Sequence, residues 1–261
     1  MEARNGEQNM YRVLSRFYRQ LAEPRNHFAS QARVVGHLLA ELPNGTEARV
    51  LDAACGTGDV LKCLWEAGSR SLYGCDGSED MLQQVQFDGI RGRVSHVEWG
   101  QLDRYLRTHD PFDCIYILGN SLAHADLTKI EGILGSMQGG LSDGGVAIVD
   151  VRRWALASGG VRDGSGRADS EWRFLVEAEL DGRRYQVSDK ACLEGSVQRV
   201  MYRFVDAVEP QGTLQEELVY HVFSAKEICE LGRRIGFAVA ETKVFEEWPY
   251  DVVALKQPRN G

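Results

Sequence analysis

The sequence predicts an α/β fold: helices come first, a mostly parallel sheet follows, and a small antiparallel sheet is inserted into it. Three observations carry this prediction. A strand, a glycine-rich turn and a helix follow one another between Ala48 and Ala67. Apolar strands then alternate with helices as far as Arg153, which requires parallel strands joined by crossovers. After Arg153 the pattern changes to extended runs separated by glycine turns, which is typical of antiparallel strands.

The elements are predicted in chain order from periodicity and punctuation. Apolar residues recur at helical spacing over residues 9–41, interrupted at Pro24. Strands are expected at 48–51, 71–75, 94–99, 112–118 and 146–149, and helices at 59–67, from Ser78 onward, and at 127–141. Ser78 is expected to cap its helix because acidic residues follow it in the first turn. Residues 142–145 are expected to form a turn.

The inserted sheet is expected from strands at 171–180, 183–192, 196–208 and 218–222, with turns at Asp181-Gly182 and Glu194-Gly195. The main fold then resumes with a helix at 224–235 and strands at 238–245 and 251–256. We therefore expect four parts: a helical lid (1–45), a cofactor-binding core (46–153), an antiparallel insertion that serves substrate or oligomer contacts (154–222), and the end of the core sheet (223–261).

The glycine turn is the chemically informative segment. A short strand ends at Asp52, and Cys55-Gly-Thr-Gly58 follows before a helix. Glycines let the backbone approach a ligand closely, and the helix start offers free N–H groups to an anionic group. The next strand ends at Asp76, whose carboxylate is placed to bind a ribose diol.

Asp-x-x-x-Gly-x-Gly followed by Asp76 resembles the cofactor site of class I S-adenosylmethionine (SAM)-dependent methyltransferases, which have a Rossmann-like sheet of seven strands. Leu61 stands where a dinucleotide-binding fingerprint has its third Gly or Ala, but a nicotinamide site and a purely structural turn stay open as alternatives. The resemblance implies SAM as the cofactor. It also implies the cofactor-binding residues Asp52, Ala54, Gly56, Gly58, Asp76, Gly77, Met81, Gly100, Gln101, Leu102 and Leu118.

Two later segments narrow the resemblance. Leu118-Gly-Asn-Ser-Leu-Ala-His124 and Val149-Asp-Val-Arg-Arg153 are similar to segments of the glycine N-methyltransferase family. The family implies that Asn120 binds the amine or carboxylate of the substrate and that Arg152 pairs with the carboxylate through its planar guanidinium. This chain has Val151 where the family has His, and Arg153 where it has Asn, so the identity of the amino acid stays open.

The remaining candidate residues are aromatic or titratable. His124 is a candidate general base in catalysis, beside Asn120 and Arg152, with loop packing as the competing interpretation. Tyr18 in the N-terminal helices and Tyr220 in the insertion are expected to line the substrate site.

We therefore expect a SAM-dependent methyltransferase acting on a small molecule, most simply the amine of an amino acid or of another carboxylate-bearing compound. Methylation of oxygen or carbon in a natural-product intermediate stays open. A non-catalytic SAM-binding partner subunit stays open too, although that role would not need Asn120 and Arg152. The resemblance also allows a homo-oligomer.

Composition excludes several further classes. The net charge is −8 and no basic tract occurs, which argues against nucleic acid as a partner. No apolar run approaches the roughly 20 residues that cross a bilayer, and the first residues are polar, so we expect no membrane partner and a cytoplasmic location. The six cysteines show no C-x-x-C spacing, and we expect no metal site.

Overall fold

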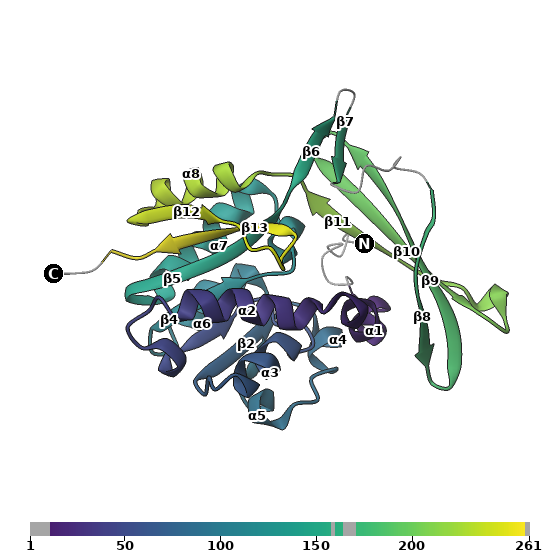
Figure 1. The fold of residues 1–261 in the computed structure, drawn as a ribbon, viewed down its shortest axis with the longest axis horizontal. Coiled ribbons are helices and arrows are strands. Elements are labelled where there is room, and N and C mark those ends of the chain that lie inside the picture. The colour runs from purple at the N-terminus through teal and green to yellow at the C-terminus, as the bar shows by residue number, and fades with distance from the viewer. Residues whose placement is uncertain (1–10, 158–159, 164–170, 259–261) are drawn as a thin grey trace, which may run out of the picture.

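The computed structural model describes residues 11–157, 160–163 and 171–258. These residues form a seven-stranded sheet covered by helices, and a four-stranded antiparallel sheet beside it, with helix α1 (Tyr18–Ala22) between the two sheets (Figure 1). The seven-stranded α/β sheet and the inserted antiparallel sheet are therefore confirmed. The expected helix start at residues 9 and 10 lies outside the described residues, as do the parts of the four expected regions at 1–10, 158–159, 164–170 and 259–261.

The large sheet has the strand order β12-β13-β5-β4-β1-β2-β3. Its strands are β1 (Val50–Asp52), β2 (Leu72–Asp76), β3 (Val94–His96), β4 (Phe112–Ile117), β5 (Leu141–Arg152), β12 (Val239–Lys243) and β13 (Tyr250–Lys256). Strands β1 to β5 run parallel, and β13 runs antiparallel to both β5 and β12. The carboxyl ends of β1, β2, β4 and β5 therefore meet along one edge, where ligands bind in open α/β sheets.

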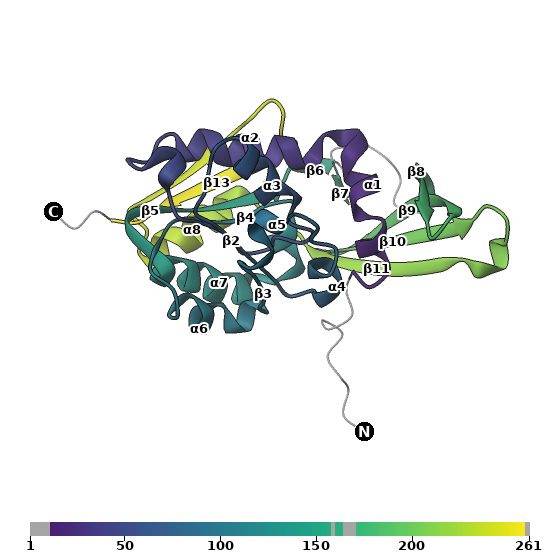
Figure 2. The same ribbon diagram turned by 90° about the horizontal axis from the view of Figure 1, so that it is seen from below.

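Helices cover both faces of this sheet (Figure 2). Helices α2 (His27–Leu39) and α3 (Asp59–Glu66) lie on one face, where Val35, Leu38 and Leu61 pack against strand residues such as Tyr116. Helices α6 (Leu102–Leu106), α7 (Leu127–Gly140) and α8 (Ala225–Ile235) lie on the other face. Strands β1 and β4 are almost wholly buried because both of their faces are covered, which explains why they read as continuous apolar runs.

Helix ends follow the sequence signals. The Ser78 hydroxyl accepts a hydrogen bond from the Met81 N–H and caps α4 (Glu79–Leu82), as expected, although that helix has only four residues. Ser224 and Glu227 form a capping box at the start of α8, and Gly236 ends that helix with φ +113°. A second short helix, α5 (Asp88–Arg91), follows α4.

The insertion begins with a hairpin that the sequence did not predict, β6 (Trp154–Ala157) with β7 (Gly160–Asp163). The sheet of β8 (Arg173–Leu180), β9 (Arg183–Glu194), β10 (Val197–Asp206) and β11 (Leu214–His221) follows in simple up-and-down order. Its first turn has positive φ at Asp181 and Gly182, +52° and +75°, which is the backbone that a two-residue hairpin turn requires. The first expected turn is therefore at its predicted position. The second lies one residue later than expected, at Gly195 and Ser196, because Glu194 still belongs to β9 and pairs with Val197.

Three expectations need correction. The N-terminal helical stretch is broken into η1 (Leu14–Arg16), α1, η2 (Glu23–Arg25) and α2, with Asn26 in the left-handed region after Pro24. Residues 142–145 lie within β5 rather than in a separate turn, because β5 bulges there against β4. Strand β3 ends at His96, and Trp99–Gln101 form the 3-10 helix η4 instead. No helix among the described residues is both long and apolar enough to cross a bilayer.

Candidate active site

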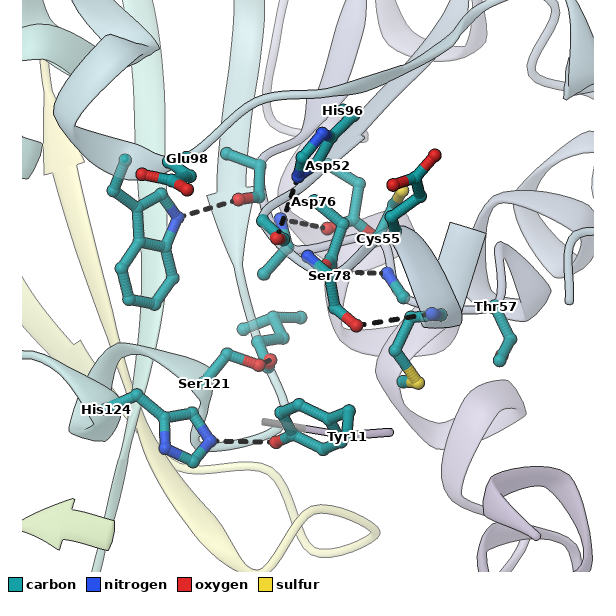
Figure 3. Close-up of a pocket in the computed structure, with 18 of the residues that line it drawn as sticks. Tyr11, Asp52, Cys55, Thr57, Asp76, Ser78, His96, Glu98, Ser121 and His124 are labelled. Atoms are coloured by element: carbon teal, nitrogen blue, oxygen red, sulfur yellow. Dashed lines mark hydrogen bonds between the residues drawn. The ribbon is translucent and has the colours of Figure 1, made fainter. Parts of the chain in front are cut away.

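A cavity of about 830 Å³ lies at the carboxyl edge of β1, β2 and β4; we call it the glycine-loop cavity. Figure 3 shows Asp52, Asp76 and Cys55 at one end and Tyr11 with His124 at the other. Eight of the expected cofactor residues line it: Asp52, Ala54, Gly56, Asp76, Gly77, Met81, Gly100 and Leu118. Its size is in the range of small-molecule sites.

The two glycines of the loop have different roles. Gly56 has φ +51°, and a Cβ there would lie 3.0 Å from Met81 Cε, so the backbone itself forms the cavity wall. Gly58 has φ +76° and caps α3, and a Cβ there would lie 2.9 Å from Ile90 Cδ1. Among the described residues Gly58 is not part of the cavity lining, so the structure gives it a conformational role instead of a contact.

Asp76 organises the entrance to the loop. Its Oδ2 accepts a hydrogen bond from the Gly56 N–H and its Oδ1 accepts one from the Ser78 N–H, both at 2.8 Å. Each carboxylate oxygen retains a second acceptor direction, which leaves room for two ligand hydroxyls. Burial raises the pKa of Asp76, against the lowering effect of these two backbone bonds. The residues thus fit a ribose diol at the expected place.

Asp52 is buried at the end of β1, and its Oδ1 accepts the Ala54 N–H at 3.1 Å. Burial raises the pKa of Asp52 to about 7, against the lowering effect of that bond. Through this hydrogen bond Asp52 stabilises the turn at the start of the glycine loop. Asp52 also lines the cavity.

Two expected cofactor residues lie elsewhere. Leu102 is completely buried in the core, and Gln101 is exposed on η4. In the same segment Trp99 lines the cavity beside Gly100. The Trp99 Nε1–H donates a hydrogen bond to the Ala53 carbonyl oxygen at 2.9 Å. The sequence did not mark Trp99 as a cavity residue, because the strand predicted at 94–99 included it, whereas β3 ends at His96.

A second cavity of about 460 Å³ lies between the N-terminal helices, the inserted sheet and the ends of β4 and β5; we call it the insertion cavity. All four expected substrate residues line it: Asn120, Arg152, Tyr18 and Tyr220. Tyr11 and Tyr18 line both cavities and therefore mark their junction. Tyr250, at the start of β13, also lines the insertion cavity.

Asn120 is held in place by a buried carboxylate that the sequence did not single out. Asp150, at 1% exposure, accepts the Gly119 and Asn120 N–H groups at 2.9 and 2.8 Å and the Trp248 Nε1–H at 3.0 Å. Burial raises the pKa of Asp150 to about 7. The buried Nδ2 of Asn120 has no hydrogen-bond partner among the described residues, and an unpaired buried donor of this kind suits a ligand acceptor.

Arg152 lies between two tyrosine rings. Its guanidinium carbon is 5.7 Å from the Tyr220 ring centre and 5.8 Å from that of Tyr250, and Nη1 donates to Gln198 Oε1 at 3.0 Å. The aromatic faces hold the guanidinium plane within the cavity. Arg152 and Asn120 therefore line the same cavity although 32 positions of sequence numbering separate them.

His124 lines the glycine-loop cavity and has a partner on each ring nitrogen. A carbonyl oxygen can only accept, so Nδ1–H donates to the Val219 oxygen, and Nε2 then accepts the Tyr11 hydroxyl, both at 2.8 Å. Burial lowers the pKa of His124 to about 4, so the imidazole is neutral at pH 7. Tyr11, with φ +70°, is consequently fixed at the junction of the cavities.

Comparisons with known proteins relate the chain to methyltransferases. Residues 50–145 match the family described as "Methyltransferase domain". The chain is 36% identical to a glycine/sarcosine N-methyltransferase of Halorhodospira halochloris over 121 residues, which are 44% of each protein. The chain spans less than half of the length of the first curated relatives that it matches.

Solved structures resemble the whole chain. The sugar N-methyltransferase KedS8 from Streptoalloteichus has a TM-score of 0.73 at 22% identity, over 100% of this chain and 98% of that one. The SAM-bound amino pentose methyltransferase CalS10 from Micromonospora echinaspora has a TM-score of 0.65 at 17% identity, over 92% and 96%. The class I methyltransferase fold and the resemblance to the glycine N-methyltransferase family are thus confirmed.

Proposed function

We propose that this protein transfers a methyl group from SAM to a small molecule, and that the acceptor is an amine in a compound that also bears a carboxylate. The observation that carries the proposal is the pair of cavities that share Tyr11 and Tyr18. One has the glycine loop and Asp76, and the other has Asn120 and Arg152. This is the arrangement that a reaction between two small molecules requires.

Bound SAM would supply the hard chemistry, an electrophilic methyl group on a sulfonium. The protein would bind and orient. Asp76 would hold the ribose hydroxyls and the Gly56 backbone would lie against the ligand. The SAM-bound neighbour and the methyltransferase-domain match support this cofactor.

The acceptor side would contribute position and exclusion of water. Arg152 would hold the carboxylate through two parallel hydrogen bonds, and the unpaired Asn120 Nδ2–H would donate to the acceptor. Holding two reactants in line is worth several kcal/mol of the barrier. An amine that enters unprotonated needs no strong base, which suits a neutral His124 whose nitrogens are both engaged.

An amino sugar is a second candidate acceptor. The insertion cavity, at about 460 Å³, is roomier than glycine needs and includes acids beside its cations, among them Glu171 and Asp189. The whole-chain likeness to the sugar N-methyltransferase KedS8 favours the same class. A screen of acceptors also separates both amine classes from methylation of oxygen or carbon and from a role as a non-catalytic SAM-binding subunit.

Two measurements test the proposal. Calorimetric titration should give saturable SAM binding. Absence of SAM binding by the folded protein would refute the proposed methyltransferase function altogether. Turnover of SAM should then be screened against glycine, sarcosine, larger amino acids, amino sugars and the matching alcohols. Turnover with amines that carry a carboxylate supports the finer proposal, turnover with amino sugars supports the second candidate, and binding without any turnover favours the partner subunit.

A further inference from the structure

Residues 11–22, the first described part of the expected helical lid, make several contacts with the inserted sheet; from here on, "the lid" means this segment. The Glu216 carboxylate accepts the Leu14 N–H at 2.6 Å and the Val13 N–H at 3.3 Å. Gln20 exchanges two hydrogen bonds with the backbone of Glu179, at 2.9 and 2.7 Å. Phe17 stacks on a core phenylalanine of that sheet with ring centres 4.6 Å apart. The lid and the inserted sheet are therefore packed as one body.

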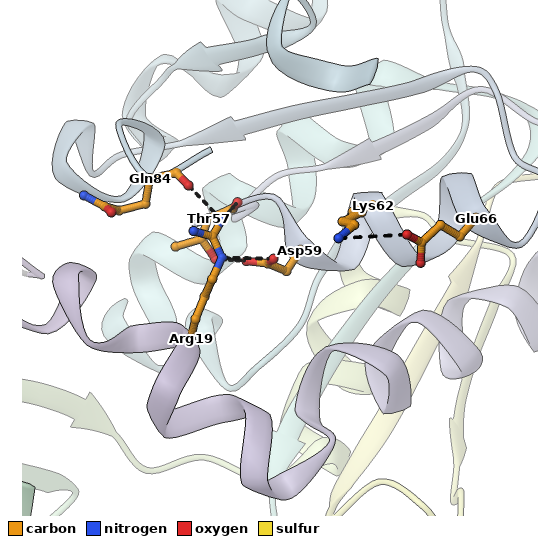
Figure 4. Close-up of polar contacts among 6 residues, drawn as sticks. All are labelled: Arg19, Thr57, Asp59, Lys62, Glu66 and Gln84. Carbon is orange, nitrogen blue, oxygen red and sulfur yellow. Dashed lines mark hydrogen bonds and ion pairs between the residues drawn. The ribbon is translucent and has the colours of Figure 1, made fainter. Parts of the chain in front are cut away.

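One lid side chain, Arg19, reaches in the other direction to the core (Figure 4). Its Nε donates to both carboxylate oxygens of Asp59, at 3.0 and 2.8 Å. Its Nη2 donates to the carbonyl oxygens of Thr57 and Gln84, at 3.1 and 2.7 Å. The Thr57 hydroxyl in turn donates to Asp59 Oδ2 at 2.6 Å. A single guanidinium thus joins the lid to three points of the core.

Two of these three partners belong to the wall of the glycine-loop cavity. Thr57 and Asp59 line it, and Gln84 follows closely after Met81, which also lines it. Tyr18, the residue before Arg19, lines both cavities. Arg19 therefore ties the lid directly to the glycine loop, in addition to the Tyr11–His124 hydrogen bond that joins the lid to the loop after β4.

The geometry points to Arg19 as a latch: we propose that its contacts with Asp59, Thr57 and Gln84 hold the lid over the glycine-loop cavity, and that their rupture governs release of SAM and of its demethylated product. The inference rests on the proposed SAM site. Arg19 is a positioning residue, since it acts through the lid and the loop. A fork of bonds to a carboxylate and two carbonyls is a geometry that lysine cannot reproduce.

The test measures dissociation of SAM and of S-adenosylhomocysteine by rapid mixing, for wild type, Arg19→Ala and Arg19→Lys. We expect Arg19→Ala to release both ligands at least about tenfold faster, with association no slower, and Arg19→Lys to lie between. Raising salt from about 50 to about 500 mM should speed release from wild type and leave Arg19→Ala unchanged, because the screened ion pair is already gone.

Two matched controls separate the latch from general effects. Arg16→Ala removes an exposed ion pair between the same lid and Asp181, and Lys62→Ala removes an exposed pair with Glu66 on the same helix as Asp59. Both should release ligand at the wild-type rate. If Arg19→Ala fails to fold, Arg19→Lys decides alone.

Release from the folded Arg19 variants at the wild-type rate overturns the latch. So does an affinity loss that comes only from slower association, since that would mean a distorted site. A wild-type protein that binds no SAM instead refutes the proposed function, which is a different result from binding with unchanged release.

Discussion

The two cavities are built in opposite ways. The glycine-loop cavity takes its two largest continuous stretches of lining from residues 52–59 and 76–83, near the ends of two adjacent parallel strands. The insertion cavity draws on segments from the lid, the ends of β4 and β5, all four strands of the inserted sheet and the final hairpin. The first depends mainly on backbone conformation, and the second depends on side chains that meet only after the sheets have packed. Changes to backbone and to side chains should therefore affect them differently.

The largest effect should come from the backbone of the loop. Gly56→Val forces a branched side chain onto φ +51° and against Met81, so SAM affinity should fall by at least about 100-fold. Gly45→Val is the control: Gly45 has the same φ, but a Cβ there meets no described atom within 4 Å. Calorimetry should show normal binding for Gly45→Val, and normal binding by Gly56→Val would mean that the loop is only structural.

The insertion cavity should respond most to loss of its cation. Arg152→Ala should weaken a carboxylate acceptor by roughly 2–4 kcal/mol, about 30- to 1,000-fold, and leave SAM affinity unchanged. Steady-state kinetics with glycine and glycinamide, in wild type and variant, form a double-mutant cycle. The neighbouring Arg153→Ala, which removes a pair with Asp251 at 2.7 Å, should act like wild type. Strictly additive losses would show that Arg152 and the carboxylate do not meet.

Asp76 offers a smaller effect on the cofactor side. Asp76→Ala removes the acceptor for ligand hydroxyls and leaves the Gly56 and Ser78 N–H groups unpaired, which should cost roughly 1–3 kcal/mol of SAM affinity. That corresponds to about a tenfold to hundredfold weaker titration. The KM for the acceptor, measured at saturating SAM, should stay constant. A change in this KM with unchanged SAM affinity would show that Asp76 contacts the acceptor and not SAM.

The last expected effect concerns how stability responds to acid, and it leaves ligand binding at neutral pH aside. The pKa of His124 is lowered to about 4 in the fold, from 6.5 when unfolded, so the unfolded chain binds the extra proton between these values and stability falls as pH drops through them. The substitution His124→Gln should reduce this acid-induced loss in the free energy of unfolding by about 1–3 kcal/mol. The raised pKa of Asp150 acts with the opposite sign, but equally in both proteins.

Denaturant unfolding of wild type and His124→Gln from pH 4 to pH 7 measures the difference. Parallel pH profiles for the two proteins would show that the pKa of His124 is the same in the native and unfolded states, contrary to its burial and its assigned hydrogen bonds.

Sequence alone determined the parts whose conformation is local. The alternation of strands and helices predicted the sheet. Glycines directly before a helix predicted the loop, because glycine adopts a positive φ at the lowest cost, as Gly56 and Gly58 do. Asp76 followed from its place at the end of a strand. Asn120 and Arg152 were found by resemblance, and packing placed both in one cavity.

Tertiary structure decided the contacts between distant segments. Asp150 beneath Asn120, Glu216 at the lid and Arg19 on Asp59 join residues that are 30, about 200 and 40 positions apart. Sequence periodicity reports which face of an element is buried, but not which polar group a distant element presents to it. Trp99 was missed for the same reason: the strand before it ended early, and a 3-10 turn brought its ring into the cavity. Local backbone preference thus determined the glycine-loop cavity, whereas packing of the lid and the insertion formed the insertion cavity.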